Sequence, residues 1–161
     1  MGYFRNENLS QLNFLNNGLN NNLKNNLIKK ERSISKTKME KKLIKSLLIL
    51  DTETTGLDEN NDEVIEIGCI LFHVPTKSVL SQLSFLLPVQ INDAQHINGI
   101  PVEVSNVSQP WTEGMDLLLK LVDSCDLIVA HNAAFDKKWF GKGNLPNLNK
   151  NWLCSLEDIN W

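Results

Sequence analysis

The order of apolar segments from Leu47 onward limits the fold more than any other feature of this sequence. Three segments typical of strands come first, followed by a helix, a short strand, a second helix and a last strand. The predicted strands are 47–50, 64–74, 79–87, 127–130 and 152–156, and the predicted helices are 111–122 and 133–140. A turn at Pro75–Lys77 makes the second and third strands a hairpin. We therefore expect an α/β protein with a mixed sheet flanked by helices.

Local patterns predict the faces and ends of these elements. The continuous apolar run Leu47–Leu50 is typical of a strand that is covered on both faces. In the first helix, apolar residues recur at helical spacing, at Trp111, Met115, Leu118, Leu119 and Val122. Thr112 can serve as the N-cap of this helix. Gly141 and Gly143 should stop the second helix after Phe140.

Charge divides the chain into a basic N-terminal part and an acidic remainder. Residues 1–46 carry ten basic and three acidic residues, whereas residues 47–161 carry six basic and sixteen acidic residues, which together give the net charge of −3. Asn dominates the first part, and we expect residues 1–38 to be largely disordered. The division predicts a tail at 1–46 and a domain at 47–161. The tail can be a nucleic-acid-binding arm, a targeting leader, or without function, with translation starting at Met39.

Two classes of protein are excluded by simple counts. No apolar run approaches the length of about 20 residues that a membrane-spanning helix needs, so no membrane partner is expected. The three cysteines form no Cys-x-x-Cys pair, which argues against a secreted disulfide scaffold and favours a cytoplasmic location.

Carboxylates follow two of the predicted buried strands. Asp51 and Glu53 end the first strand, and residues two apart in a strand share a face. Asp136 lies about one helical turn beyond the strand 127–130, so neighbouring parallel strands would bring it close to the other two. Gathered carboxylates repel one another unless a cation lies between them, and oxygen ligands suit Mg²⁺ or Mn²⁺. The alternative is a solvated strand end without metal.

These segments resemble a known family. Ile49-Leu-Asp-Thr-Glu-Thr-Thr-Gly-Leu57 and His131-Asn-Ala-Ala-Phe-Asp136 are similar to the first two motifs of the DnaQ-like, or DEDD, 3′–5′ exonucleases, above all of proofreading subunits of bacterial replicative DNA polymerases. Val64-Ile-Glu-Ile-Gly68 resembles the second strand of that family. His96-Ile-Asn-Gly-Ile100 resembles its His-Gly-Ile segment, with Asn98 at the position of the motif's His.

The resemblance implies a ribonuclease H-like fold and hydrolysis of single-stranded 3′ ends, of DNA rather than RNA, with two divalent cations, Mg²⁺ or Mn²⁺. A DNA polymerase complex is the implied partner. The implied catalytic residues and metal ligands are Asp51, Glu53 and Asp136. The implied substrate-binding residues are Thr52, Thr54, Leu57, Asn98, Asn132 and Phe135.

The family's third motif, His-x-x-x-x-Asp, is absent after Asp136. That motif supplies the general base and a fourth carboxylate, so residues 1–161 are expected to be a C-terminally truncated domain and a slow nuclease. One alternative is therefore a catalytically inert module that binds nucleic acid or a polymerase partner. Another is a haloacid-dehalogenase-type phosphatase, although that motif requires Asp where this chain has Glu53, and it gives the segment 131–136 no role.

Overall fold

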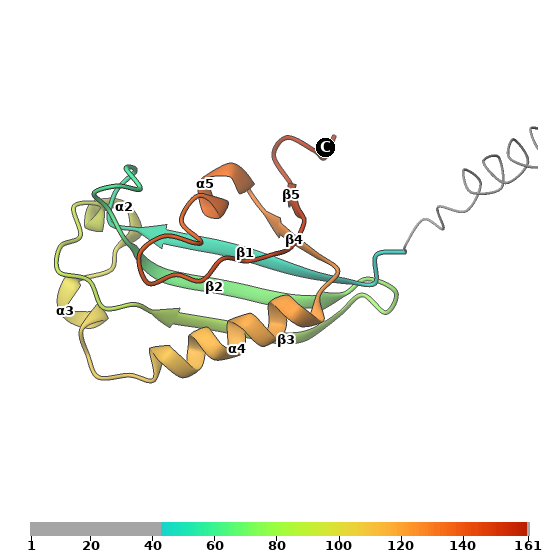
Figure 1. Cartoon of the computed structure of the whole chain (residues 1–161), viewed down its shortest axis with the longest axis horizontal. Coiled ribbons are helices and arrows are strands. Elements are labelled where there is room, and N and C mark those ends of the chain that lie inside the picture. The colour runs from blue at the N-terminus through green and yellow to red at the C-terminus, as the bar shows by residue number, and fades with distance from the viewer. Residues whose placement is uncertain (1–42, 161) are drawn as a thin grey trace, which may run out of the picture. The chain divides into compact units, whose positions relative to one another are not determined.

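The computed structural model describes residues 43–160, which form a mixed sheet with helices (Figure 1). The strands are β1 (Ser46–Thr54), β2 (Val64–His73), β3 (Ser78–Leu86), β4 (Leu127–Ala130) and β5 (Trp152–Cys154). The helices are α2 (Gln95–Asn98), α3 (Val102–Ser105), α4 (Trp111–Ser124) and α5 (Ala133–Lys137). The predicted α/β class and the mixed sheet are confirmed, and the predicted strands and helices occur in the predicted order; the short helices α2 and α3, which lie between β3 and α4, were not predicted.

The strand order places β1 at the centre of the sheet. The order is β3-β2-β1-β4-β5, with β2 antiparallel to both β1 and β3, and β4 parallel to both β1 and β5. In the hairpin turn between β2 and β3, Lys77 has a left-handed φ of 54°, which suits a tight connection of two twisted strands. Because β1 and β4 are parallel, the motifs that follow them lie at the same end of the sheet.

The core lies on one face of the sheet. On β1, Leu48 and Leu50 are 0% and 1% exposed, and Leu118 of α4 is 0% exposed in the same cluster of apolar side chains. Trp139 and Phe140, which follow α5, also belong to this cluster. The helical spacing in the sequence therefore predicted correctly which face of α4 is buried.

The N-terminus of α4 differs from the prediction. The helix begins at Trp111, directly after Pro110, and no side chain caps it. Thr112 lies inside the first turn, where its hydroxyl donates a hydrogen bond to Glu113 Oε2 at 2.7 Å. The predicted N-cap at Thr112 is therefore wrong. Proline is accepted just before the helix because its missing N–H would have no partner within the helix there.

The other face of β1 is open, so the prediction that Leu47–Leu50 is covered on both faces is wrong. Ile49 is 42% exposed, although it pairs in register with Ile70 of β2 and Val129 of β4. Helix α4 and the segment after α5 both pack on the face of Leu48 and Leu50. A continuous apolar run therefore does not establish how many faces of a strand are covered.

Some predicted segments are shorter or lie outside the described residues. Helix α5 ends at Lys137 and is followed by turns at 138–140, whereas a helix to Phe140 was predicted. The predicted disorder of residues 1–38, and nearly all of the predicted tail 1–46, lie outside the described range. Within residues 43–160, no helix is long and apolar enough to cross a membrane.

Candidate active site

The end of β1 presents two carboxylates on one face and two threonines on the other. Asp51 is exposed and Glu53 is half-buried, whereas Thr52 and Thr54 are 6% and 7% exposed. This alternation follows from the two-residue repeat of a strand. Glu53 also pairs in register with Glu66 of β2, so three carboxylates gather near the open face.

Asp136 of α5 is hydrogen-bonded to Thr52, the residue of β1 that lies between Asp51 and Glu53. The register of β4 along β1 reaches only Ile49, so Thr52 lies beyond the last paired residue. There the backbone N–H and the hydroxyl of Thr52 both donate to Asp136 Oδ1, at 3.0 and 2.8 Å. The carboxylate replaces the missing strand partner, and Asp136 is only 2% exposed. The first and second motifs of the sequence therefore meet at Thr52.

A residue in the left-handed backbone conformation lies between β4 and the helix that carries Asp136. Asn132, between β4 and α5, has a φ of 63°, a conformation that asparagine tolerates better than most residues. The chain thus reverses directly from the strand into the helix, and Asp136 falls in the first turn of α5. Asn132 itself is exposed. Its position favours a role in shaping the turn.

Burial and, to a smaller extent, neighbouring charges raise the pKa values of two carboxyl groups. Burial raises the pKa of Asp136 to about 6, with a further rise from Asp51, although the hydrogen bonds from Thr52 oppose the shift. Burial also raises the pKa of Glu53, and the negative charges of Asp51 and Glu66 add to this rise. A bound cation would remove the cost of both effects.

The carboxylates fit a divalent cation by chemistry, but they do not form a ready-made cage. Asp51, Glu53 and Asp136 supply the oxygen donors that Mg²⁺ and Mn²⁺ prefer. Among residues 43–160, however, no three His, Cys, Asp or Glu side chains converge closely enough to hold a metal ion. Asp136 lies at the edge of β1, where its Oδ1 accepts from the backbone N–H and the hydroxyl of Thr52, whereas the side chains of Asp51 and Glu53 project from one face of the strand. The three-ligand set stays a prediction.

A pocket of about 300 Å³ opens beside these carboxylates. It gathers five of the six residues predicted to bind substrate, namely Thr52, Thr54, Leu57, Asn98 and Phe135. The sixth, Asn132, is not among its lining residues. Leu57 and Ile97 are 78% and 77% exposed, so two apolar side chains at this pocket are available to a ligand.

Sequence reasoning missed several lining residues. They include Gly56, Asp93, Ala94, His96 and Ile97. Gly56 is adjacent in sequence to Leu57, and the other four lie within five residues of Asn98. Closeness in sequence to the predicted residues was therefore the available signal. The side chains of Thr54 and Asn98 are occupied by the protein itself. The Thr54 hydroxyl donates to the Gly56 carbonyl at 2.6 Å.

Asn98 ties the segment 92–100 to the end of β1. Its Nδ2 donates to the Thr54 carbonyl at 3.0 Å, and its Oδ1 accepts from the Ile100 N–H at 3.0 Å. Its amide also exchanges hydrogen bonds with the side chain of Asn92, which is 8% exposed. The side-chain amide of Asn98 therefore has a structural role, because its hydrogen bonds hold the segment that lines the pocket against β1.

We expect Asn98→Ala to lower the free energy of unfolding by about 1–3 kcal/mol, because partly buried partners lose their hydrogen bonds. Chemical denaturation measures this change. His96→Ala is the matched control, since His96 is exposed on the same helix and should change stability by less than about 0.5 kcal/mol. Equal stability of Asn98→Ala and the wild type would show that the amide network contributes nothing.

A comparison with known protein families identifies the family of this chain. Residues 48–153, more than half of the chain, match the model of the RNase T exonuclease family. The chain belongs to the exonuclease family. The match includes the first two motifs and the strands that carry them. It thereby supports the resemblance drawn from the sequence and the ribonuclease H-like fold.

Curated relatives of this exonuclease domain are much longer proteins. The DNA polymerase III PolC-type of Clostridium perfringens is 29% identical over 109 residues, which are 64% of this chain and 7% of that protein. The corresponding protein of Thermotoga maritima is 27% identical over 124 residues, 72% of this chain and 8% of the relative. The chain thus spans less than a tenth of the length of these relatives.

Solved exonuclease structures share the fold. Exonuclease X in complex with 5′ overhanging duplex DNA is 26% identical, with a TM-score of 0.50 over 68% of this chain and 59% of that one. E. coli exonuclease I in complex with a dT13 oligonucleotide has a TM-score of 0.56 at 16% identity, over 73% of this chain and 32% of that one. At that identity the second likeness concerns the fold alone.

Proposed function

We propose that this domain binds the 3′ end of single-stranded DNA and hydrolyses its terminal phosphodiester bond in a reaction that depends on divalent cations. The observation that carries the proposal is the contact of Asp136 with Thr52, between Asp51 and Glu53. Membership of the exonuclease family gives the reaction class. The DNA complexes of exonuclease X and exonuclease I favour DNA as the substrate.

The proposed ligands for two Mg²⁺ or Mn²⁺ ions are Asp51, Glu53 and Asp136. When bound, such ions stabilise the attacking and leaving oxygens of a phosphodiester displacement. The protein's own part is to orient the strand: the apolar side chains of Leu57 and Phe135 would lie against the terminal nucleotide. The pocket of about 300 Å³ beside the carboxylates is where that nucleotide would lie.

A polymerase complex is the proposed partner. The support is the likeness to PolC-type DNA polymerase III, in which the matching residues are a small part of a long protein. An exonuclease that works beside a polymerase receives a frayed 3′ end, and a pocket for one terminal nucleotide suits such a substrate.

The proposal is tested with a 5′-labelled single-stranded oligonucleotide in Mn²⁺. We expect slow, stepwise shortening from the 3′ end by residues 1–161, since no histidine follows His131 to act as a general base. Glu53→Gln should lower this rate about 100-fold or more, because a proposed metal ligand is lost. A circular single strand, which has no 3′ end, should stay intact. Shortening that is equal for the wild type and Glu53→Gln would refute the proposal.

A second candidate is a module that binds single-stranded DNA without cutting it. The absence of a ready-made metal cage among residues 43–160 favours this alternative. Binding of the oligonucleotide with no shortening in Mn²⁺, under conditions where a control exonuclease is active, would establish it.

A further inference from the structure

The turn between β1 and β2 is held in shape by its own side chains. Asp62 accepts hydrogen bonds from the Asp58 N–H at 2.8 Å and from the Thr55 hydroxyl at 3.4 Å. Gly56 permits this arrangement, because a Cβ there would lie 2.4 Å from Asp62 Oδ2. The turn therefore presents Leu57, which is 78% exposed, from a defined backbone.

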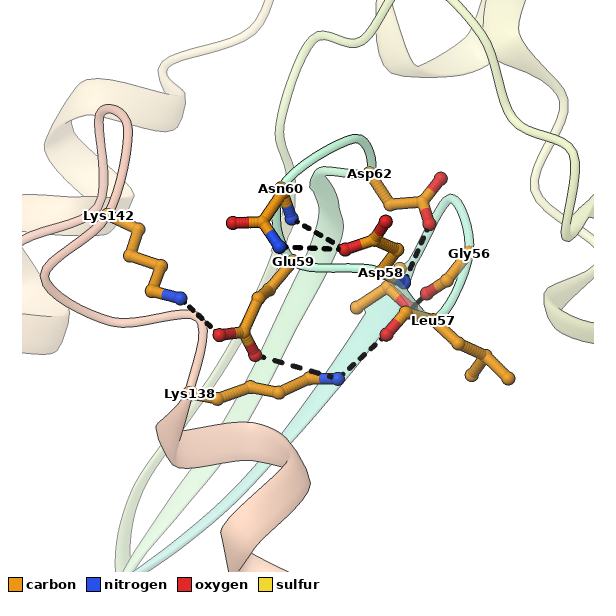
Figure 2. Close-up of polar contacts among 9 residues, drawn as sticks. Gly56, Leu57, Asp58, Glu59, Asn60, Asp62, Lys138 and Lys142 are labelled. Atoms are coloured by element: carbon orange, nitrogen blue, oxygen red, sulfur yellow. Dashed lines mark hydrogen bonds and ion pairs between the residues drawn. The ribbon is translucent and has the colours of Figure 1, made fainter.

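One lysine joins this turn to the end of α5, as Figure 2 shows. Lys138 Nζ donates to the Leu57 carbonyl at 2.8 Å and lies 3.9 Å from Glu59 Oε2. The same ammonium group lies over the ring of Phe135, 4.7 Å from its centroid, and over that of Trp139, at 5.0 Å. The positive charge of Lys138 thus interacts with a carbonyl, a carboxylate and two aromatic rings of the protein itself.

These contacts connect two walls of the candidate pocket. Leu57 lies on the turn and Phe135 lies on α5, and both line the pocket. The Phe135 ring is also held by an edge contact with Trp139, with ring centroids 5.9 Å apart. Lys138 therefore contacts both walls at once. It donates a hydrogen bond to the backbone carbonyl of Leu57, and its ammonium group lies over the ring of Phe135.

A second lysine makes only part of this connection and provides a natural comparison. Lys142 Nζ forms an ion pair with Glu59 Oε1. This ion pair also connects the turn with the segment after α5. Neither lysine lines the candidate pocket itself, but Lys138 contacts two residues that do, Leu57 and Phe135. The Glu59 ion pairs lie at the surface, where such pairs contribute little.

We propose that Lys138 is a positioning residue that fixes the separation of Leu57 and Phe135 and thereby sets the affinity of the pocket for a terminal nucleotide. The proposal rests on the proposed function, since it names what that pocket binds. It differs from direct phosphate binding by Lys138, the common use of a lysine in a nucleic-acid site.

The test measures binding of a short single-stranded oligonucleotide to residues 1–161 in Ca²⁺, by fluorescence anisotropy. We expect Lys138→Met to weaken binding about 10-fold, the lower range for loss of a charge-assisted hydrogen bond. Lys138→Arg should restore affinity to within about threefold of the wild type, because Arg keeps the donor and the ring contact. Lys142→Met should bind like the wild type.

Two further measurements separate positioning from other roles. The slope of log Kd against log salt should be equal in Lys138→Met and the wild type, whereas a lost phosphate contact would reduce it by about 0.7. Amide exchange of residues 55–60 should become faster in Lys138→Met and stay unchanged in Lys142→Met. Wild-type affinity in Lys138→Met, a reduced salt slope, or equal effects of the two lysine variants would overturn the proposal.

A wild-type chain that binds no oligonucleotide would contradict the proposed function instead. The exchange comparison would still decide whether Lys138 holds the turn. Faster exchange in Lys138→Met alone would support the positioning of the turn, and unchanged exchange would refute it.

Discussion

Replacing Asp136 with asparagine should stabilise the metal-free protein near neutral pH, although it removes a carboxylate proposed to bind metal. The pKa of Asp136 is raised from 3.8 to about 6, chiefly by burial. Such a group costs no stability below its unfolded pKa, and the cost grows as the pH rises from about 4 to about 6 and is complete above that. The shift corresponds to about 3 kcal/mol at neutral pH. Asparagine carries no charge and keeps an oxygen that can accept from Thr52.

The measurement is chemical denaturation of Asp136→Asn and the wild type in a chelator, near pH 4 and near pH 7. The difference between the two proteins isolates Asp136 from the other groups that titrate. We expect a gain of about 1–3 kcal/mol for the variant near pH 7 and almost none near pH 4. Asp116→Asn, on the exposed face of α4, is the control for loss of a surface carboxylate and should change the free energy of unfolding by less than about 0.5 kcal/mol. A variant less stable than the wild type near pH 7 would contradict the assignment.

Much of the fold was predictable because it depends on local sequence patterns. The alternation of Leu48, Leu50 and Thr52 with Asp51 and Glu53 fixes which side chains of β1 share a face. The covering of the second face was not predictable, because it depends on where helices from distant parts of the chain pack. Ile49 is as apolar as its neighbours and is nevertheless exposed.

The candidate site was predictable where its residues lie within continuous motifs. Thr52, Thr54 and Leu57 follow one another at the end of β1, and Phe135 lies beside Asp136. The contact of Asp136 with Thr52 could not be derived from spacing, because it requires that β4 stop short of the end of β1. Roles that depend on tertiary hydrogen bonds were equally hidden.

Lys138 shows the same limit of sequence reasoning. Two adjacent lysines at the end of a short helix are usually solvated. Here the first, Lys137, is exposed, whereas the second spans from α5 to the turn after β1. Only the three-dimensional arrangement of Leu57, Phe135 and Trp139 gives the second lysine its role.

Mn²⁺ should stabilise the wild-type protein strongly and Asp51→Ala hardly at all. Asp51 is exposed beside Glu53, and its charge raises the pKa of both Glu53 and Asp136. It is therefore the carboxylate most closely coupled to the other two, and a cation bound among them would interact with all three charges. A ligand at 100 times its Kd adds about 2.7 kcal/mol to the free energy of unfolding. Loss of a carboxylate ligand should raise the Kd about 100-fold and remove most of that gain.

Thermal unfolding with increasing Mn²⁺, together with calorimetric titration, measures both quantities. Glu66→Gln is the matched control, since Glu66 is the cross-strand neighbour of Glu53 and accepts a hydrogen bond from Ser84 at 2.5 Å. It should keep most of the stabilisation by Mn²⁺. If Asp51→Ala gains as much stability from Mn²⁺ as the wild type does, the ion binds elsewhere on the chain. The carboxylates at the end of β1 would then be a solvated strand end, as the simplest interpretation of the sequence allows.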